Sequence, residues 1–194
     1  MSLLQDTEGK LIVFLVGEAE QDTSRIENRH RFLCAGDYTH PISKHGRLQV
    51  DACKKWIEDI LKSIERNNQI TYSSPISCAF TTACILTKID TPCLQYDELK
   101  DIKKTMSTES INNRISDMLN YLESESNKKT MIIVTHSNVI NMIIKMVQSP
   151  QKRIEDKSTP IKIDHTGVTI MVFNDSDKTW SIRLINGTDH LRNI

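Results

Sequence analysis

The chain has 194 residues, of which 25 are Lys or Arg and 25 are Asp or Glu, so its formal net charge is zero. This balance gives no overall field that would draw the chain to nucleic acid or to an anionic membrane, and direct nucleic-acid binding is not expected. Its apolar runs are far shorter than the ~20 residues that cross a bilayer, so no membrane association is expected either.

The length, with no Pro/Gly/Ser-rich linker and no internal repeat, predicts one domain over residues 1–194, in which residues 1–10 are a polar N-terminal extension. The five cysteines are odd in number and form no CxxC pair, which argues against a disulfide framework and against a structural zinc site. We therefore expect a reducing compartment, the cytosol or the nucleus, and neither a cofactor nor a metal.

The first part of the chain predicts a buried strand, a loop and an amphipathic helix. Residues 11–16 (LIVFLV) are a continuous apolar run rich in β-branched residues, which is typical of a central parallel strand. Residues 18–40 show neither strand nor helix periodicity and predict a long loop. Ser43 can cap a helix whose apolar residues recur at three-four spacing, as one buried stripe requires. They are Cys53, Trp56, Ile57, Ile60, Leu61 and Ile64.

The middle of the chain alternates short apolar strands with amphipathic helices. Strands are expected at residues 70–73, 92–95 and 131–134, and helices at residues 76–88, 107–124 and 139–147. This alternation predicts a parallel sheet that is covered by helices on both faces.

The end of the chain predicts a different arrangement. Residues 168–173 and 180–185 flank the polar residues 174–178, which suit a hairpin turn. The predicted fold class is therefore α/β, a three-layer α/β/α sandwich whose mainly parallel sheet carries an antiparallel edge hairpin. Residues 11–16 and 131–134 are expected to be adjacent central strands, because both are apolar throughout.

Five short motifs, most of them beside predicted strand ends or helix starts, occur in a characteristic order. They are PISKHGRLQ at residues 41–49, SSPISCAFTTA at 73–83, LKDI at 99–102, VTHS at 134–137 and NGTDHL at 186–191. In this order they resemble the histidine phosphatase (phosphoglycerate mutase-like) superfamily over nearly the whole chain. The spacing is closest to eukaryotic branches, such as the phosphatase domain of suppressors of T-cell receptor signalling or the phosphatase-like subunit of the RNA polymerase III factor TFIIIC.

The resemblance implies a phosphate site that this chain has partly lost. The family's Arg-His-Gly after the first strand supplies a His nucleophile and an Arg that holds the phosphoryl oxygens. Here an ungapped reading places Val16 and Gly17 at the Arg and His positions, and a gapped reading deletes the pair. The position of the family's second phosphate-binding arginine is occupied by Cys78. Its side chain lacks the paired N–H donors with which arginine binds a phosphoryl group.

Two vestigial candidates of the family's core set remain, His136 and, at the acid position, Asp101, while Glu18 brings a negative charge to the mouth of the site. His136 is either a relic phosphate donor or a residue whose side chain caps the next helix or bonds a neighbouring carbonyl. Asp101 is either a general acid or a solvated carboxylate. Cys78 as a replacement nucleophile would need an anion nest with an arginine, and the sequence shows none.

Losing a nucleophile costs about a million-fold in rate, and losing one charge-stabilising donor costs roughly a hundred- to a thousand-fold. We therefore expect a pseudophosphatase that acts through a protein partner or as a homodimer, with no phosphorylated small molecule as ligand. The alternatives are a weak or altered phosphomonoesterase and a sensor that binds a phosphorylated ligand without hydrolysing it. Arg25, Arg29, His30 and Arg31 form a basic cluster that is a candidate partner contact.

Overall fold

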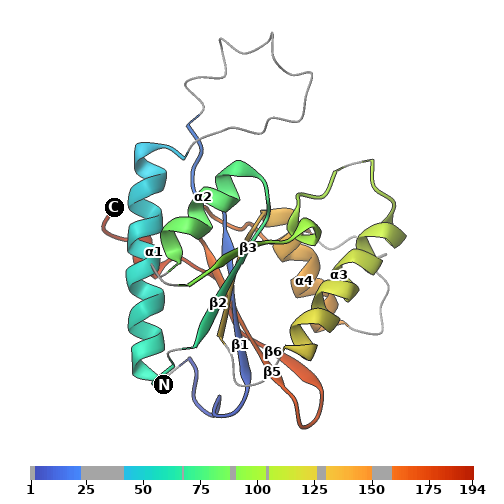
Figure 1. Ribbon diagram of the computed structural model, residues 1–194. Helices are drawn as coiled ribbons and strands as arrows, with labels where there is room; N and C mark the ends of the chain where they lie inside the picture. Colours follow the sequence, from blue (N-terminus) through green and yellow to red (C-terminus); the bar gives the residue numbers. More distant parts are fainter. Residues whose placement is uncertain are drawn as a thin grey trace.

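The computed structural model describes residues 3–22, 42–66, 68–87, 91–103, 105–125, 130–149 and 159–194. These segments contain a six-stranded sheet of order β3-β2-β4-β1-β5-β6 (Figure 1). Its strands are β1 (Leu11–Gly17), β2 (Gln69–Ser73), β3 (Cys93–Gln95), β4 (Thr130–Thr135), β5 (Val168–Asn174) and β6 (Thr179–Gly187). The helices are α1 (Lys44–Ser63), α2 (Ser77–Leu86), α3 (Thr108–Ser124) and α4 (Ser137–Gln148), with short 3-10 helices η2 (Asp97–Leu99) and η3 (Asp189–Leu191).

The central strands are fully buried. β1 pairs in parallel with β4, where Val13 lies opposite Met131, and antiparallel with β5, where Val13 lies opposite Met171. Every residue of β1 and β4 is buried, as an uninterrupted apolar run in the middle of a sheet requires. The prediction that residues 11–16 and 131–134 form adjacent central strands is confirmed.

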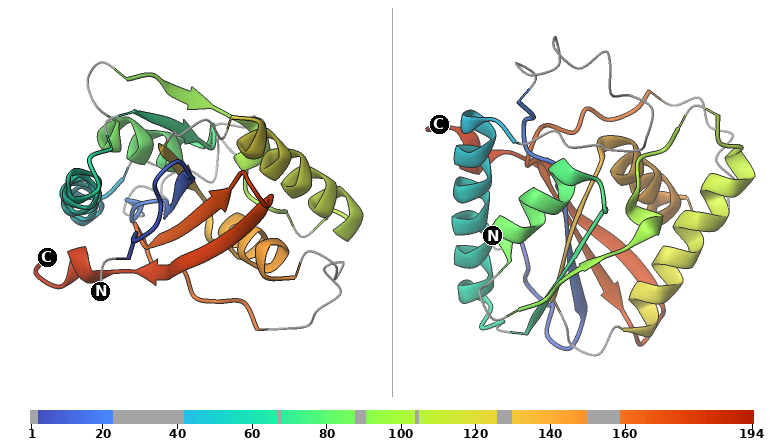
Figure 2. Two further views of the ribbon diagram at one scale, coloured as in Figure 1. Left: turned by 90° about the horizontal axis from the view of Figure 1, so that it is seen from below. Right: turned by 45° about the horizontal axis from the view of Figure 1, so that its top comes forward.

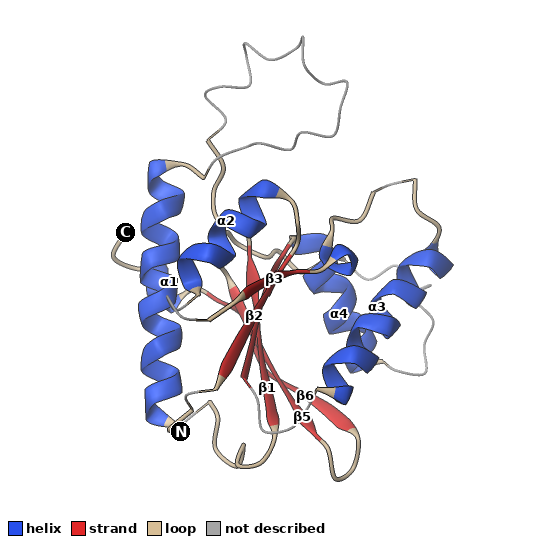
Figure 3. Cartoon of the chain, in the orientation of Figure 1, coloured by secondary structure: helices blue, strands red, loops and turns tan. Residues whose placement is uncertain are grey.

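Alternate side chains of β1 point to opposite layers of helices. Ile12 and Phe14 pack in a core with α1 and α2, whereas Leu11 and Val13 pack in a second core with α3 and α4. Figures 2 and 3 show these two pairs of helices on opposite faces of the sheet. The predicted three-layer α/β/α sandwich is therefore confirmed.

The predicted hairpin forms one edge of this sheet. β5 and β6 are antiparallel, and Phe173 lies opposite Trp180 with the ring centroids 4.9 Å apart. The chain then returns along α1, where the rings of Trp56 and His190 lie 5.6 Å apart and the C-terminus ends beside this helix (Figure 1). None of the helices in the described segments combines the length and apolar character needed to span a bilayer.

The start of α1 is fixed tightly to the segment that follows β1. The Ser43 side chain accepts a hydrogen bond from the Gly46 amide at 2.8 Å, so the predicted cap is confirmed. The Ser43 amide in turn donates to the Glu20 carbonyl at 2.8 Å. A Cβ added at Gly46 would lie only 2.3 Å from that carbonyl oxygen, so glycine permits the close approach of the helix to residue 20.

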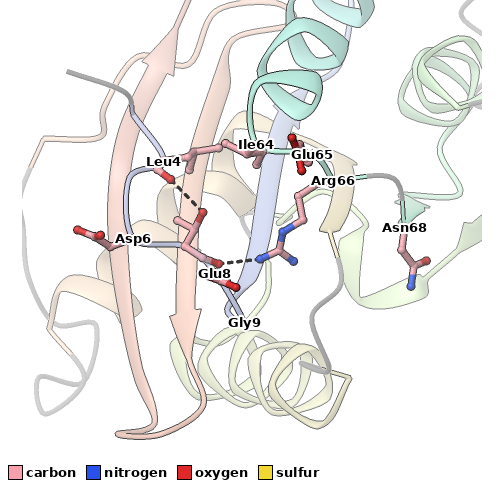
Figure 4. A pocket seen from close by; sticks show the side chains of 9 residues that line it. Leu4, Asp6, Glu8, Gly9, Ile64, Glu65, Arg66 and Asn68 are labelled. Carbon is pink, nitrogen blue, oxygen red and sulfur yellow. Dashed lines mark hydrogen bonds between the residues drawn. The ribbon is translucent and has the colours of Figure 1, made fainter.

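The N-terminal residues pack at the end of the sheet where β1 and β2 begin. Leu4 is buried in the core with α1, and the Arg66 guanidinium donates to the carbonyls of Thr7 at 2.7 Å and Lys10 at 3.0 Å. A surface hollow of about 820 Å³ lies between this segment and the end of α1 (Figure 4). Its wall carries the carboxylates of Asp6, Glu8 and Glu65. Because the Arg66 guanidinium already bonds these carbonyls and the wall is acidic, the hollow does not favour binding of an anion.

Candidate functional site

Polar side chains gather at the carboxyl ends of three neighbouring strands. Glu18 directly follows β1, Ser74 follows β2 and His136 follows β4. The ladder of the sheet continues for one residue beyond these ends, because the Glu18 amide donates to the Thr135 carbonyl at 3.0 Å and the Ser74 amide donates to the Val134 carbonyl at 2.9 Å. This is the edge at which open parallel sheets bind their ligands.

The Glu18 carboxylate is the centre of this group. It forms an ion pair with Nδ1 of His136, although its side chain retains 20% exposure while that of His136 retains only 7%. The Cys78 thiol, from the first turn of α2, donates to Oε2 at 3.1 Å, and the Gln21 amide donates to Oε1 at 3.3 Å. The carboxylate thus accepts bonds from side chains of three separate segments. We call Glu18, Gln21, Ser74, Cys78 and His136 the strand-end cluster.

The second ring nitrogen of His136 is also engaged. Nε2 lies 3.0 Å from the Ser74 hydroxyl oxygen, which also accepts the Ile76 amide at 3.3 Å. His136 is the N-cap residue of α4, yet its side chain makes no capping bond. The expectation that this side chain caps the helix or bonds a neighbouring carbonyl is therefore wrong: its ring joins a carboxylate to a hydroxyl.

Burial and charge set the protonation states in this cluster. Burial alone would raise the pKa of Glu18, but the hydrogen bond and the charge of His136, helped by the Cys78 thiol, outweigh it, so the pKa lies below its ordinary value. Burial, together with the charge of Glu18 and its hydrogen bond, raises the pKa of Cys78 to about 12. The Cys78 thiol is therefore protonated at neutral pH, and this argues against its use as a nucleophile.

Ser74, His136 and Glu18 stand in the order hydroxyl, imidazole and carboxylate that serine hydrolases use. Ser74, however, has 0% exposed surface. A reacting carbonyl or phosphoryl group could not reach its oxygen without movement of the surrounding strand ends. In this conformation the contacts of Ser74 and Glu18 orient the His136 ring, and the Ser74 hydroxyl is not exposed as a nucleophile.

Val16 and Gly17, which the sequence reading aligns with the family's Arg-His pair, place no side chain in the strand-end cluster. Val16 is fully buried in the core beneath α1 and α2. A Cβ added at Gly17 would lie 2.8 Å from the Asp164 carbonyl oxygen, so this position has no room for a side chain. The next residues are also fixed, since the Ala19 amide donates to the Thr82 hydroxyl at 3.1 Å and the Glu20 amide donates to the Gln49 side chain at 3.2 Å.

Asp101 lies apart from these contacts. Its carboxylate accepts the Ile102 amide at 2.8 Å and the Asn138 side chain at 3.2 Å, and no bond joins it to the strand-end cluster among the described residues. The basic cluster of Arg25, Arg29, His30 and Arg31 lies outside the described residues.

The sequence analysis placed Glu18, Cys78 and His136 at this site and missed the other two members of the cluster, Ser74 and Gln21. Ser74 is part of the SSP motif and could have been read as a partner of His136, because both residues follow parallel strands. Gln21 follows no recognisable motif.

The cluster is also the place where this chain could hold a cation. The donor atoms of Glu18, Cys78 and His136 all lie within 4.8 Å of one another. In the described segments, no arginine forms a hydrogen bond or ion pair with any of the three.

Part of the chain matches the model of a known family. Residues 101–188 match the model of the histidine phosphatase superfamily (branch 1). No curated protein matches the sequence of the chain.

Solved structures share the fold over nearly the whole chain. Bacillus stearothermophilus YhfR superposes with a TM-score of 0.71 at 16% identity, covering 94% of this chain and 100% of that one. Phosphoserine phosphatase from Entamoeba histolytica, in complex with 3-phosphoglyceric acid, has a TM-score of 0.67 at 18% identity, covering 93% and 99%. Phosphoglycerate mutase from Plasmodium falciparum has a TM-score of 0.57 at 19% identity, covering 95% and 96%. The fold expected from the resemblance is therefore confirmed: the chain shares the fold of these phosphoglycerate mutase-like structures, and its residues 101–188 match the model of the histidine phosphatase superfamily (branch 1).

Proposed function

We propose that the chain is a pseudophosphatase, whose phosphate site is filled by its own Glu18 carboxylate, and that it acts in the cytosol or nucleus by binding a protein partner or a second copy of itself. The observation that carries this proposal is the contact of Glu18 with His136 and Cys78. The family resemblance assigns His136 and the position of Cys78 to the phosphate. Here both side chains bond a carboxylate instead.

The charge of Glu18 opposes a phosphate at this place. Two like unit charges about 4 Å apart repel by ~4 kcal/mol at an effective dielectric constant of about 20. That energy corresponds to roughly a thousand-fold in a binding constant. The family's arginines would have offset such a charge, but Val16, Gly17 and Cys78 bring none. A phosphate would therefore have to displace Glu18 before it could meet the remaining donors.

Hydrolysis of para-nitrophenyl phosphate and of phosphoglycerates tests the loss of catalysis. The parent chain and its His136→Ala variant should show the same background rate, and a His45→Ala variant is the matched control because His45 is exposed on α1. Vanadate should leave the thermal midpoint of the parent unchanged. A clear drop in rate on His136→Ala alone would show a working enzyme. A rise of the midpoint with vanadate but no hydrolysis would show the phospho-ligand sensor instead.

The interaction part of the proposal is supported by the loss of the chemical site in a fold that is otherwise complete. Large exposed apolar residues, such as Leu48 on α1 and Leu94 on β3, lie on separate elements, as is ordinary for a protein surface. We assign the contact to the basic cluster of Arg25, Arg29, His30 and Arg31.

Sedimentation of the purified chain over a wide concentration range should show a dimer. Replacing Arg25, Arg29 and Arg31 together by Ala should weaken it, whereas replacing the exposed Lys44 and Arg47 of α1 should not. If the chain is a monomer at every concentration, the interaction role requires a purified complex with a native partner whose affinity falls when these arginines are replaced. Without such a complex the interaction role is refuted.

A further inference from the structure

The strand-end cluster brings together side chains with the chemistry of a transition-metal site. Glu18 follows β1, Cys78 is in the first turn of α2, and His136 follows β4. A carboxylate oxygen, a sulfur and an imidazole nitrogen are the ligand types that Zn²⁺ takes in proteins. Cys78 and His136 are 2% and 5% exposed, so they would hold an ion away from bulk water.

The distances between the donor atoms suit one small ion. In a tetrahedral zinc site, bonds of about 2.0 to 2.3 Å place the ligand atoms roughly 3.3 to 3.8 Å apart. Here Sγ of Cys78 lies 3.1 Å from Oε2 of Glu18, and all three donor atoms lie within 4.8 Å of one another. Small side-chain rotations would bring them to coordination distance, whereas the strand ends that carry them need not move.

We propose that Glu18, Cys78 and His136 bind a divalent cation of the zinc class, with His136 coordinating through Nδ1. Each ion that binds forms a metal–sulfur and a metal–nitrogen bond and breaks the S–H bond of Cys78 and the N–H bond at Nδ1 of His136, and both protons leave to solvent, while Nε2 keeps its hydrogen for Ser74. The carboxylate and the thiolate then neutralise the two positive charges of the ion. This inference goes beyond the pseudophosphatase proposal and does not depend on it.

Residues around these ligands provide the support that metal sites need. A histidine ligand usually donates its second ring N–H to a neighbouring acceptor, which fixes the orientation of the ring. The Ser74 hydroxyl oxygen is in that position, 3.0 Å from Nε2 of His136. The Gln21 amide lies 3.3 Å from both Oε1 of Glu18 and Sγ of Cys78, so its oxygen is placed to take the fourth position after a flip of the amide.

A second pair of thiols that could bind metal must be removed before the binding is measured. Cys84 and Cys93 lie next to each other on α2 and β3 and could take up metal on the surface. The test therefore uses the full chain with Cys84→Ser and Cys93→Ser as its background. This background is stripped with EDTA, dialysed and titrated with CoCl₂ alone, since cobalt reports thiolate ligation and tetrahedral geometry in its absorption spectrum.

The background should bind one equivalent of cobalt with a thiolate-to-metal charge-transfer band and intense visible bands, and excess ZnCl₂ should remove both. Adding Cys78→Ser should abolish the charge-transfer band and weaken binding at least tenfold. Absence of the bands in the background, or their persistence after Cys78→Ser, would overturn the assignment. If Cys78→Ser fails to fold, Glu18→Gln serves in its place, and an unchanged affinity in that variant counts equally against the site.

Phosphatase assays with EDTA and with ZnCl₂ separate the two proposals. Hydrolysis that appears only with zinc and is lost in Cys78→Ser would support the metal site and end the pseudophosphatase proposal. Zinc binding without hydrolysis supports both. If neither the cobalt bands nor hydrolysis is observed, the metal site is refuted and the pseudophosphatase proposal stands.

Discussion

The Glu18 carboxylate lies against Nδ1 of His136, and this contact joins the ends of two strands that are adjacent in the sheet but distant in the sequence. The same carboxylate accepts a hydrogen bond from the Cys78 thiol. The ends of β1 and β4 and the start of α2 therefore meet at one negative charge. A phosphate site needs the opposite arrangement, with positive donors around an empty centre.

Replacing Glu18 by Gln should destabilise the protein, because the variant removes the charge that His136 faces in a buried place. We expect the free energy of unfolding to fall by about 1 to 3 kcal/mol in urea denaturation. Asp51→Asn is the matched control, since Asp51 forms an exposed pair with Arg47 and should change stability by less than about 0.5 kcal/mol. Equal effects of the two variants would mean that the Glu18 contact contributes nothing.

Replacing Gly46 by Ala should destabilise the chain, although alanine favours a helix over glycine by roughly 0.5 to 1 kcal/mol. The added Cβ would meet the Glu20 carbonyl oxygen at 2.3 Å, and this neighbour is backbone that cannot rotate away. Forcing the helix and residue 20 apart costs typically 1 to 3 kcal/mol. Thermal and urea unfolding measure the change, and Lys44→Ala, at an exposed position in the same turn, is the control. A more stable Gly46→Ala protein would contradict the close approach.

Most of the fold was predictable because its signals are local. The apolar run of β1 and the three-four spacing of α1 each specify one element, and Ser43 caps the helix where the sequence placed its start. Alternation of strands and helices then fixes a covered parallel sheet. The final hairpin followed in the same way from the polar residues between β5 and β6.

The site was predictable only in part, because it depends on which way side chains turn at strand ends. The sequence placed Glu18 at the mouth of the site and His136 at the end of β4, but a pattern of residues does not state that they touch. The role of Gly46 was invisible for a related reason. It depends on the Glu20 backbone, which α1 meets only in the folded chain.

Acid should destabilise the protein partly through His190. Burial lowers the pKa of His190 below its ordinary value, although a hydrogen bond from the ring to the Thr166 backbone and the charge of Asp189 oppose this. A histidine whose pKa is lower in the folded state binds fewer protons there, so stability is lost as the pH falls below the ordinary value of about 6.5. The free energy of unfolding should therefore drop between about pH 7.5 and about pH 5.5.

The drop should be smaller in a His190→Gln variant, which keeps a polar side chain that can bond the Thr166 hydroxyl. His45→Gln is the control, because His45 is exposed on α1. An identical pH dependence in the parent and both variants would show that His190 does not carry it.

The final prediction tests whether Glu18 itself keeps phosphate out. Cys78→Arg alone should create no phosphate site, because the new guanidinium would pair with the Glu18 carboxylate that the thiol now bonds at 3.1 Å. The double variant Glu18→Gln/Cys78→Arg removes that internal anion and leaves a guanidinium and the His136 ring free. Charge-assisted hydrogen bonds to an anion are each worth roughly 1.5 to 3 kcal/mol. Vanadate or phosphate should therefore raise the thermal midpoint of the double variant and leave the parent and both single variants unchanged. Unfolding curves without ligand establish that each variant is folded before this comparison is made. If Cys78→Arg alone gains the same shift as the double variant, Glu18 does not exclude the anion, and the proposed lack of phosphatase activity must rest on the absence of arginine at Val16 and Cys78 alone.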